Sequence, residues 1–87
     1  MNGSELLKSG RVMLVLDPVP GQSGIHILYE KTKQLMNPLP GEEVWAVFYN
    51  NNLSRLKVLH IDVTGVDLLT RRLNHGRFQI LNLVSSF

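Results

Sequence analysis

The sequence predicts a small α+β domain, a mostly antiparallel β-sheet with one helix packed on it, in the order β-α-β-β-β-β. The first observation is the length of 87 residues, which fits a single domain. The second is a series of short apolar runs with strand periodicity, separated by turn residues. The third is one segment with helical periodicity. We expect a flexible tail over residues 1–10 and one α+β domain over residues 11–87.

The first half of the chain supplies one strand and the helix. A strand is expected over residues 11–16, and the unbroken apolar run at residues 12–16 predicts that it is buried on both faces. A stretch rich in proline and glycine ends this strand, since proline donates no ladder hydrogen bond. Apolar residues at helical spacing then predict a helix that begins at Gln22 or Ser23. The helix should end near Asn37, because the residue before a proline is pushed out of the helical region.

The second half of the chain supplies the remaining strands. Apolar residues that alternate in β fashion predict strands over residues 44–49 and 56–63. Residues 66–73 fit both a helix and a strand, and their place after a turn at Gly65 favours the strand. A last strand is expected over residues 77–84.

Composition narrows the class of protein. The chain has no cysteine, which excludes disulfides and thiolate metal sites. No apolar run approaches the roughly 18 residues of a membrane helix, and we expect a cytoplasmic protein with no membrane partner. Residues 1–43 carry four basic and five acidic groups, whereas residues 44–87 carry five basic and two acidic groups. This imbalance indicates one basic surface on the second half, or basic residues that only solubilise a sheet.

The polar residues form no recognisable catalytic or metal-binding pattern. His26, His60 and His75 are scattered, and none has a partner at metal-ligand spacing. Asp62 precedes a turn and is interpreted as a hydrogen-bond acceptor for that turn. The glycines at 21–24 lack the lysine of a nucleotide-binding loop and are interpreted as a helix cap. The sequence therefore predicts no catalytic residue, no metal and no cofactor, and a protein that is not an enzyme.

Five basic residues remain as a candidate nucleic-acid-binding group. Arg55 and Lys57 lie two apart in one expected strand, so they share a face. Either Arg71 or Arg72 in the next strand can share that face, and Arg77 begins the following strand. Such a patch would contact phosphates. Because aromatic residues that stack on bases are sparse here, a plain solvated sheet face fits the same residues equally well.

The segment that contains these residues combines several short motifs in one order. They are Arg-Leu-Lys-Val-Leu at 55–59, Asp62, Gly65, Arg-Arg-Leu at 71–73 and Gly-Arg-Phe at 76–78. Together they resemble the small TnpB-type accessory protein of the insertion-sequence-sixty-six family of bacterial mobile elements. The resemblance covers roughly residues 11–80 and is dense only in the last third.

The resemblance implies a non-enzymatic accessory protein that assists transposition beside a separate transposase. In one interpretation the basic sheet face contacts element DNA through phosphates. In the alternative, the domain docks on the transposase or forms a homodimer without direct DNA contact. An open sheet edge or an apolar C-terminal segment would then make the contact. The apolar residues of that segment are Ile80, Leu81, Leu83, Val84 and Phe87.

Overall fold

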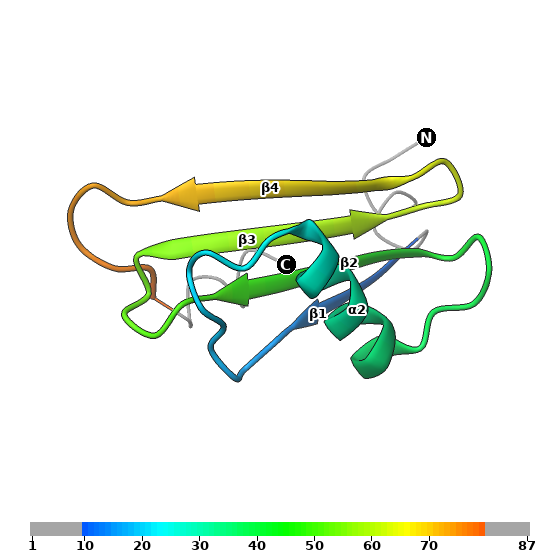
Figure 1. Ribbon diagram of the computed structural model, residues 1–87, viewed down its shortest axis with the longest axis horizontal. Helices are drawn as coiled ribbons and strands as arrows, with labels where there is room; N and C mark the ends of the chain where they lie inside the picture. The colour runs from blue at the N-terminus through cyan, green and yellow to red at the C-terminus, as the bar shows by residue number, and fades with distance from the viewer. Residues whose placement is uncertain (1–9, 80–87) are drawn as a thin grey trace.

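A computed structural model of the chain describes residues 10–79 as one sheet with a single helix packed against it (Figure 1). The fold is α+β, as the sequence predicts. Chain order gives one strand, the helix and then three strands, each close to its expected position. The elements are β1 (Gly10–Leu14), α2 (Ile25–Met36), β2 (Glu43–Tyr49), β3 (Arg55–Ile61) and β4 (Val66–Arg72).

The four strands lie in the order β1-β2-β3-β4, and the sheet is mixed. β2, β3 and β4 form an antiparallel meander joined by two short turns. β1 instead pairs with β2 in parallel, with Gly10 opposite Glu43 and Leu14 opposite Val47. A parallel neighbour cannot be reached through a tight hairpin, and α2 provides the crossover. The helix therefore lies on one face of the sheet, as Figure 1 shows.

The expectation that the first strand is buried on both faces is wrong. Val12, in the middle of β1, is 45% exposed. Within residues 10–79, β1 has a strand neighbour on one side only, β2. An edge position leaves part of such a strand open to solvent even when its sequence is continuously apolar.

In the second half of the chain, the structure decides between helix and strand for residues 66–73 and differs from the expected start of the last strand. Residues 66–73 were compatible with both a helix and a strand, and β4 shows that they form a strand. The strand expected over residues 77–84 does not begin where predicted, because residues 77–79 are irregular. The rest of that segment lies outside the described residues, as does the expected tail up to residue 9.

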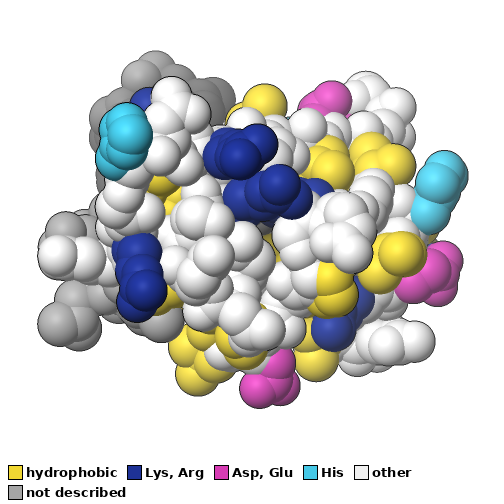
Figure 2. All heavy atoms as spheres, turned by 60° about the vertical axis from the view of Figure 1, so that its left-hand side comes forward, with side chains coloured by type: hydrophobic (Ala, Val, Ile, Leu, Met, Phe, Trp, Pro, Cys, Tyr) yellow, Lys and Arg dark blue, Asp and Glu magenta, His cyan; other side chains and the backbone are white. Residues whose placement is uncertain are grey.

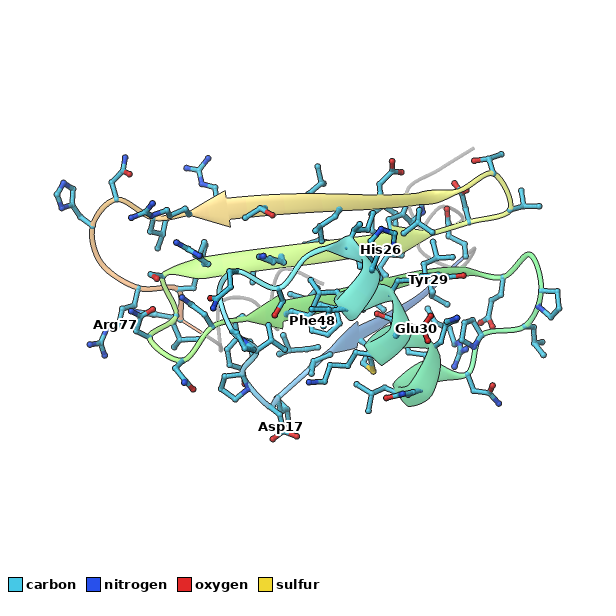
Figure 3. All side chains as sticks on the ribbon, in the orientation of Figure 1. Asp17, His26, Tyr29, Glu30, Phe48 and Arg77 are labelled. Carbon is cyan, nitrogen blue, oxygen red and sulfur yellow. The ribbon has the colours of Figure 1, made fainter. Side chains whose placement is uncertain are left out.

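The core lies between α2 and the sheet. Phe48 of β2, Leu28 of α2 and Leu59 of β3 are completely buried there. Figure 3 labels Phe48 beside α2. Along β2 and β3, residues that face the helix alternate with residues of the other face. Ala46 of β2 and Leu59 of β3 lie opposite each other on the face that the helix covers. Burial of these side chains, each worth about 1.5–3 kcal/mol, holds the helix to the sheet.

The helix ends where the sequence predicts, but it begins at Ile25 rather than at Gln22 or Ser23. Gly24 is the N-cap in extended backbone, and Asn37 is the C-cap with a left-handed φ of 46°. Asn37 donates its backbone N–H to the Lys33 carbonyl, and Pro38 follows. Asparagine tolerates the left-handed region and proline cannot continue a helix, so this pair stops α2.

Two tight turns close the meander at opposite ends of the sheet. In the β2–β3 turn, Asn50 Oδ1 accepts hydrogen bonds from the backbone N–H groups of Ser54 and Arg55. In the β3–β4 turn, Asp62 Oδ1 accepts from Thr64 N, Thr64 Oγ1 and Gly65 N. Asp62 is thus the turn acceptor that the sequence predicts, and these bonds, led by the Thr64 hydroxyl, lower the pKa of its carboxyl group.

Candidate nucleic-acid interface

The strand register brings two of the predicted arginines directly together. Arg55 at the start of β3 lies opposite Arg72 at the end of β4. Opposite residues of an antiparallel pair project from the same face, with Cβ atoms about 5 Å apart. Both arginines therefore lie on one face of the sheet, the face that carries α2. The spacing of residues in the sequence predicts a shared face for Arg55 and one of the two β4 arginines, but it does not predict which face carries the helix. Arg71 lies opposite Leu56 and projects from the other face.

Arg77 is brought to the same end of the sheet by the loop that follows β4. Leu73 N donates to the Ser54 carbonyl at 2.8 Å, and Phe78 N donates to the Leu53 carbonyl at 2.7 Å. These bonds tie the loop to the β2–β3 turn, and Figure 3 places Arg77 at this end. We define the basic end as Arg55, Arg71, Arg72 and Arg77.

Figure 2, in which this end is turned forward, shows one group of Lys and Arg side chains near the centre, further Lys or Arg side chains apart from it, and acidic side chains toward the margins. Within residues 10–79, no carboxylate forms an ion pair with Arg55, Arg71, Arg72 or Arg77. Arg71, Arg72 and Arg77 are exposed and Arg55 is partly exposed. Like charges placed opposite each other in a sheet destabilise it, so the pairing of Arg55 with Arg72 carries an electrostatic cost.

Gly21 makes room for Arg55. A Cβ atom at residue 21 would lie 2.8 Å from Nη1 of Arg55 and 3.2 Å from its Cδ. The arginine therefore packs directly over the backbone of the loop that precedes α2. This contact fixes the direction of one guanidinium of the basic end, and a larger residue at 21 would displace it.

Lys57 does not belong to this exposed surface, which corrects the sequence-based interpretation. It shares a face with Arg55, as expected, but that face is the one covered by α2, and Lys57 is only 8% exposed. Its ammonium donates a hydrogen bond to the Ser23 carbonyl in the loop before the helix. Burial, and then the nearby charge of Arg55, lower the pKa of Lys57. The sequence spacing gave the shared face but could not tell which face the helix covers.

A different cluster occupies the opposite end of the sheet. His60 of β3 stacks on Trp45 of β2, with ring centroids 3.8 Å apart and an angle of 22° between the rings. Its Nε2 lies 3.0 Å from Glu43 Oε2, and its Nδ1 lies 3.6 Å from Asp67 Oδ2. Asp62 follows in the turn after β3, and one of its oxygens lies within 4.8 Å of the ligand atoms of Glu43 and His60. We define the acidic cluster as Glu43, His60, Asp62 and Asp67.

Sequence reasoning missed this cluster because its members come from three segments far apart in the chain. Only the spacing of His60 and Asp62 was visible beforehand, since residues two apart in a strand share a face. The contributions of Glu43 and Asp67 depend on the pairing of β3 with both of its neighbours. His26 and His75 are exposed and lie elsewhere, on α2 and in the loop after β4.

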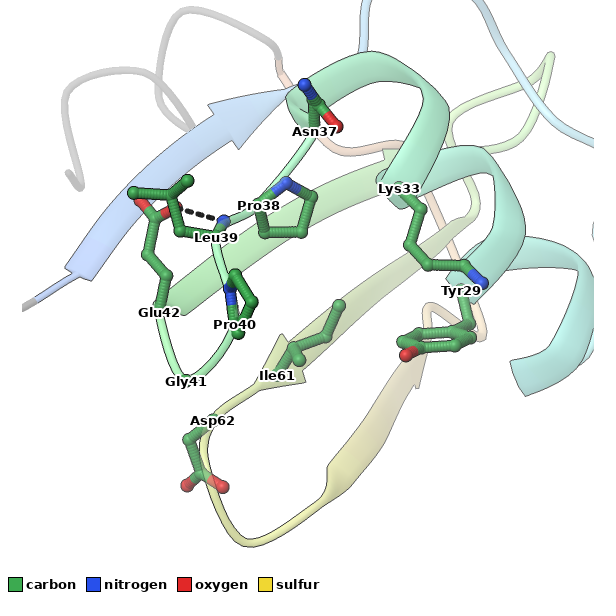
Figure 4. Close-up of a pocket in the computed structure, with 10 residues that line it drawn as sticks. All are labelled: Tyr29, Lys33, Asn37, Pro38, Leu39, Pro40, Gly41, Glu42, Ile61 and Asp62. Atoms are coloured by element: carbon green, nitrogen blue, oxygen red, sulfur yellow. Dashed lines mark hydrogen bonds between the residues drawn. The ribbon is translucent and has the colours of Figure 1, made fainter.

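The structure also contains a pocket of about 300 Å³ between the C-terminal half of α2, the loop after it and the end of β3 (Figure 4). Tyr29 and Lys33 line it from the helix, and Ile61 and Asp62 line it from the sheet. Lys33 lies over the Tyr29 ring at 4.6 Å and pairs with Glu30 at 2.9 Å. Its ammonium is therefore held within α2 and does not extend the basic end.

Across the described part of the chain, no helix is both long enough and apolar enough to cross a membrane.

The fold and its basic end define a small α+β protein that carries a group of exposed arginines at one end of a mixed sheet. The chain belongs to the IS66 Orf2-like family, whose model matches residues 10–85. Comparison with curated proteins gave no match, and comparison with solved structures gave none either. Family membership implies an accessory role in the transposition of an insertion sequence, and it confirms the resemblance seen in residues 55–78.

Proposed function

We propose that this protein assists transposition by contacting element DNA through the basic end. The observation that carries the proposal is the cross-strand pair of Arg55 and Arg72, which has no carboxylate partner within residues 10–79. Two adjacent guanidinium groups repel each other in the free protein, and a phosphate between them would remove that cost. Arginine also binds phosphate oxygens through two parallel hydrogen bonds, which suits a backbone contact.

The other two arginines extend the contact along the same end. Arg71 projects from the opposite face of β4, and Arg77 lies in the loop tied to the β2–β3 turn. Arginines on both faces would hold a duplex along the rim of the sheet rather than flat against it. Among the described residues, Trp45 stacks on His60 at the other end of the sheet, and Tyr49 near the basic end is buried, so neither offers a free face for stacking on a base. The contact is therefore with phosphates of a duplex, and its affinity should depend steeply on salt.

The test is a fluorescence anisotropy titration with duplex DNA from the ends of the element, at low and at physiological salt. A scrambled duplex of the same length is the control for sequence preference. With four phosphate contacts, the slope of log K against log salt should be about −3 to −4. Affinity should then fall about 100-fold between about 50 and 200 mM salt.

Charge reversal separates a local contact from general attraction. Arg71→Glu/Arg72→Glu should abolish measurable binding, because it replaces two phosphate contacts with repulsion. The matched control is Lys31→Glu/Lys33→Glu on α2, which changes the net charge by the same amount away from the basic end, and it should keep most of the affinity. Absence of binding by the unaltered protein even at low salt would contradict the proposal. An equal loss in both double variants would also contradict it.

A second candidate function is docking on the transposase or on a second copy of this chain. It is supported by apolar side chains exposed on the face away from α2, with Val12 45% and Leu69 65% exposed. Hydrophobic docking buries apolar area and survives salt that weakens phosphate contacts. Sedimentation of the protein with and without the transposase, at low and high salt, distinguishes the two. A complex that persists at high salt and is lost in Val12→Glu or Leu69→Glu would favour docking.

A further inference from the structure

The acidic cluster holds an imidazole between carboxylates in the manner of a metal site. His60 Nε2 faces Glu43 Oε2 at 3.0 Å, and one oxygen of Asp62 joins them. The three candidate ligand atoms all lie within 4.8 Å of one another. All three residues are partly buried, so the ligands are neither fully solvated nor sealed from an entering ion.

The spacing is close to what one cation requires. A first-row metal ion lies about 2.0–2.2 Å from imidazole nitrogen and carboxylate oxygen ligands, so two ligands of one ion are at most about 4 Å apart. To bind one ion, the ligand atoms would have to approach one another by roughly 1 Å, and rotation of a carboxylate side chain can supply this movement. Three protein ligands leave at least one coordination position for water or another donor.

The groups around these ligands hold them in place. Asp67 Oδ2 lies 3.6 Å from Nδ1 of His60, on the opposite side of the ring from Glu43. This separation is longer than a hydrogen bond. A small rotation of Asp67 would bring its carboxylate to the second nitrogen, where the usual partner of a metal-binding histidine fixes the ring and its tautomer. Trp45 stacks on the same ring, and the turn bonds to Oδ1 fix the orientation of Asp62.

Charge favours a cation at this position. Three carboxylates surround one imidazole, and their mutual repulsion falls when a divalent ion enters. The nitrogen ligand favours zinc, cobalt, nickel or copper over magnesium and calcium, which prefer oxygen. Glu43, His60 and Asp67 project from the face away from α2, and Asp62 lies in the turn after β3, where it also lines the pocket beside the helix. His60 is five residues after Arg55 along β3, a distance of about 16 Å at about 3.3 Å per residue. The cluster is thus separate from the proposed DNA contact.

We propose that Glu43, His60 and Asp62 bind one divalent first-row transition metal such as Zn²⁺, with Asp67 orienting His60 from the other side of the ring. The sequence alone predicts no metal, because the ligands meet only when β2, β3 and the turn after β3 are assembled. The proposal goes beyond the DNA contact and does not depend on it.

Trp45 gives a direct readout, because it is the only tryptophan of the chain and stacks on the proposed ligand. The experiment is a titration of the full-length, tag-free protein with Co²⁺ at neutral pH, followed by tryptophan emission. Bound Co²⁺ should quench Trp45 emission saturably, with a stoichiometry of one ion per chain. Addition of Zn²⁺, which does not quench by itself, should displace Co²⁺ and restore the emission.

Variants decide whether the quenching arises at this site. His60→Gln should remove saturable quenching, and Glu43→Gln should do the same if the first variant fails to fold by circular dichroism. Asp67→Asn should weaken Co²⁺ binding about tenfold, as expected for a partner of a metal ligand. His75→Gln, an exposed histidine elsewhere, should bind as the unaltered protein does. No saturable quenching by the unaltered protein, or equal quenching in a folded His60→Gln variant, would overturn the proposal.

Discussion

The two ends of the sheet use the same strand pairing to opposite effect. At one end, the register of β3 and β4 places Arg55 opposite Arg72, and no carboxylate within residues 10–79 pairs with either. At the other end, the same two strands place His60 opposite Asp67, with Glu43 approaching from β2. The acidic cluster contains its own partners, whereas the basic end does not. The proposed DNA contact rests on this difference, because a phosphate would supply the negative charge that the arginine pair lacks within the described residues.

The two ends also lie on different faces. Arg55 and Arg72 share the face that carries α2, whereas Glu43, His60 and Asp67 of the acidic cluster project from the face away from the helix. Arg71 reaches around to that second face at the basic end. A ligand on one end therefore need not touch the other, and each end can be altered separately.

The largest effect is expected from the core that both ends share. Phe48 is completely buried between α2 and the sheet. Phe48→Ala should lower the free energy of unfolding by about 3–5 kcal/mol, through lost burial and a residual cavity. Urea unfolding measures this, with Ile27→Ala on the exposed side of α2 as the control, which should change the free energy of unfolding by under about 0.5 kcal/mol. An unchanged free energy of unfolding in Phe48→Ala would show that the packing described between α2 and the sheet is wrong.

The next effect distinguishes the exposed arginines from the buried lysine. Arg72→Ala should reduce the slope of log K against log salt by about one, because one phosphate contact is lost. Lys57→Met should leave the slope unchanged, since the Lys57 ammonium is buried against the Ser23 carbonyl. Anisotropy titrations at four or five salt concentrations give both slopes. A smaller slope in Lys57→Met would show that Lys57 does contact a DNA phosphate.

A smaller and opposite effect is expected on stability. Arg72→Ala removes a like charge from the position opposite Arg55, so it should raise the free energy of unfolding by about 0.5 kcal/mol while it weakens DNA binding. Urea unfolding at low salt measures the change, and high salt should reduce it because exposed charges are screened. Lys31→Ala on α2 is the control. A lower free energy of unfolding in Arg72→Ala would contradict this expectation, because it would show that Arg72 makes contacts that stabilise the fold.

The smallest effect concerns pH. Burial and the charge of Arg55 lower the pKa of Lys57 below its ordinary value of 10.5. The unfolded chain therefore binds more protons than the folded chain just below pH 10.5, and in that window stability from this group rises with pH. The free energy of unfolding of the unaltered protein, relative to Lys57→Met, should increase as pH is raised from about 8 toward 10.5. A relative decrease would show that the folded state favours the charged ammonium.

Much of the fold could be predicted from local sequence patterns. The helix and the strands β2 and β3 followed from periodicity and from the residues that end them, such as Asn37 before Pro38. The function of Asp62 in its turn followed from its position before Thr64 and Gly65. The parallel pairing of β1 was not visible, because nothing in a strand's own residues states which neighbour it will take. Its edge position explains why Val12 is exposed despite an apolar sequence.

The candidate site could be predicted only in part, again because the sequence does not show how the strands pair. The spacing of Arg55 and Lys57 fixed a common face, but only the location of α2 shows that Lys57 is covered. The choice between Arg71 and Arg72 required the register of β3 and β4. The acidic cluster required three segments to be assembled, and only its pair of residues two apart was visible in the sequence. Contacts within a strand are local, whereas contacts across strands depend on the whole sheet.

The most direct test of the central claim is an NMR titration of ¹⁵N-labelled protein with duplex DNA from the ends of the element. The account predicts shifts in the backbone amides and arginine side-chain signals of the basic end, at Arg55, residues 71–73 and Arg77. The amides of Glu43, His60 and Asp67 should remain unchanged. Shifts concentrated at the acidic cluster, or spread evenly over the sheet, would contradict the assignment of DNA contact to the basic end.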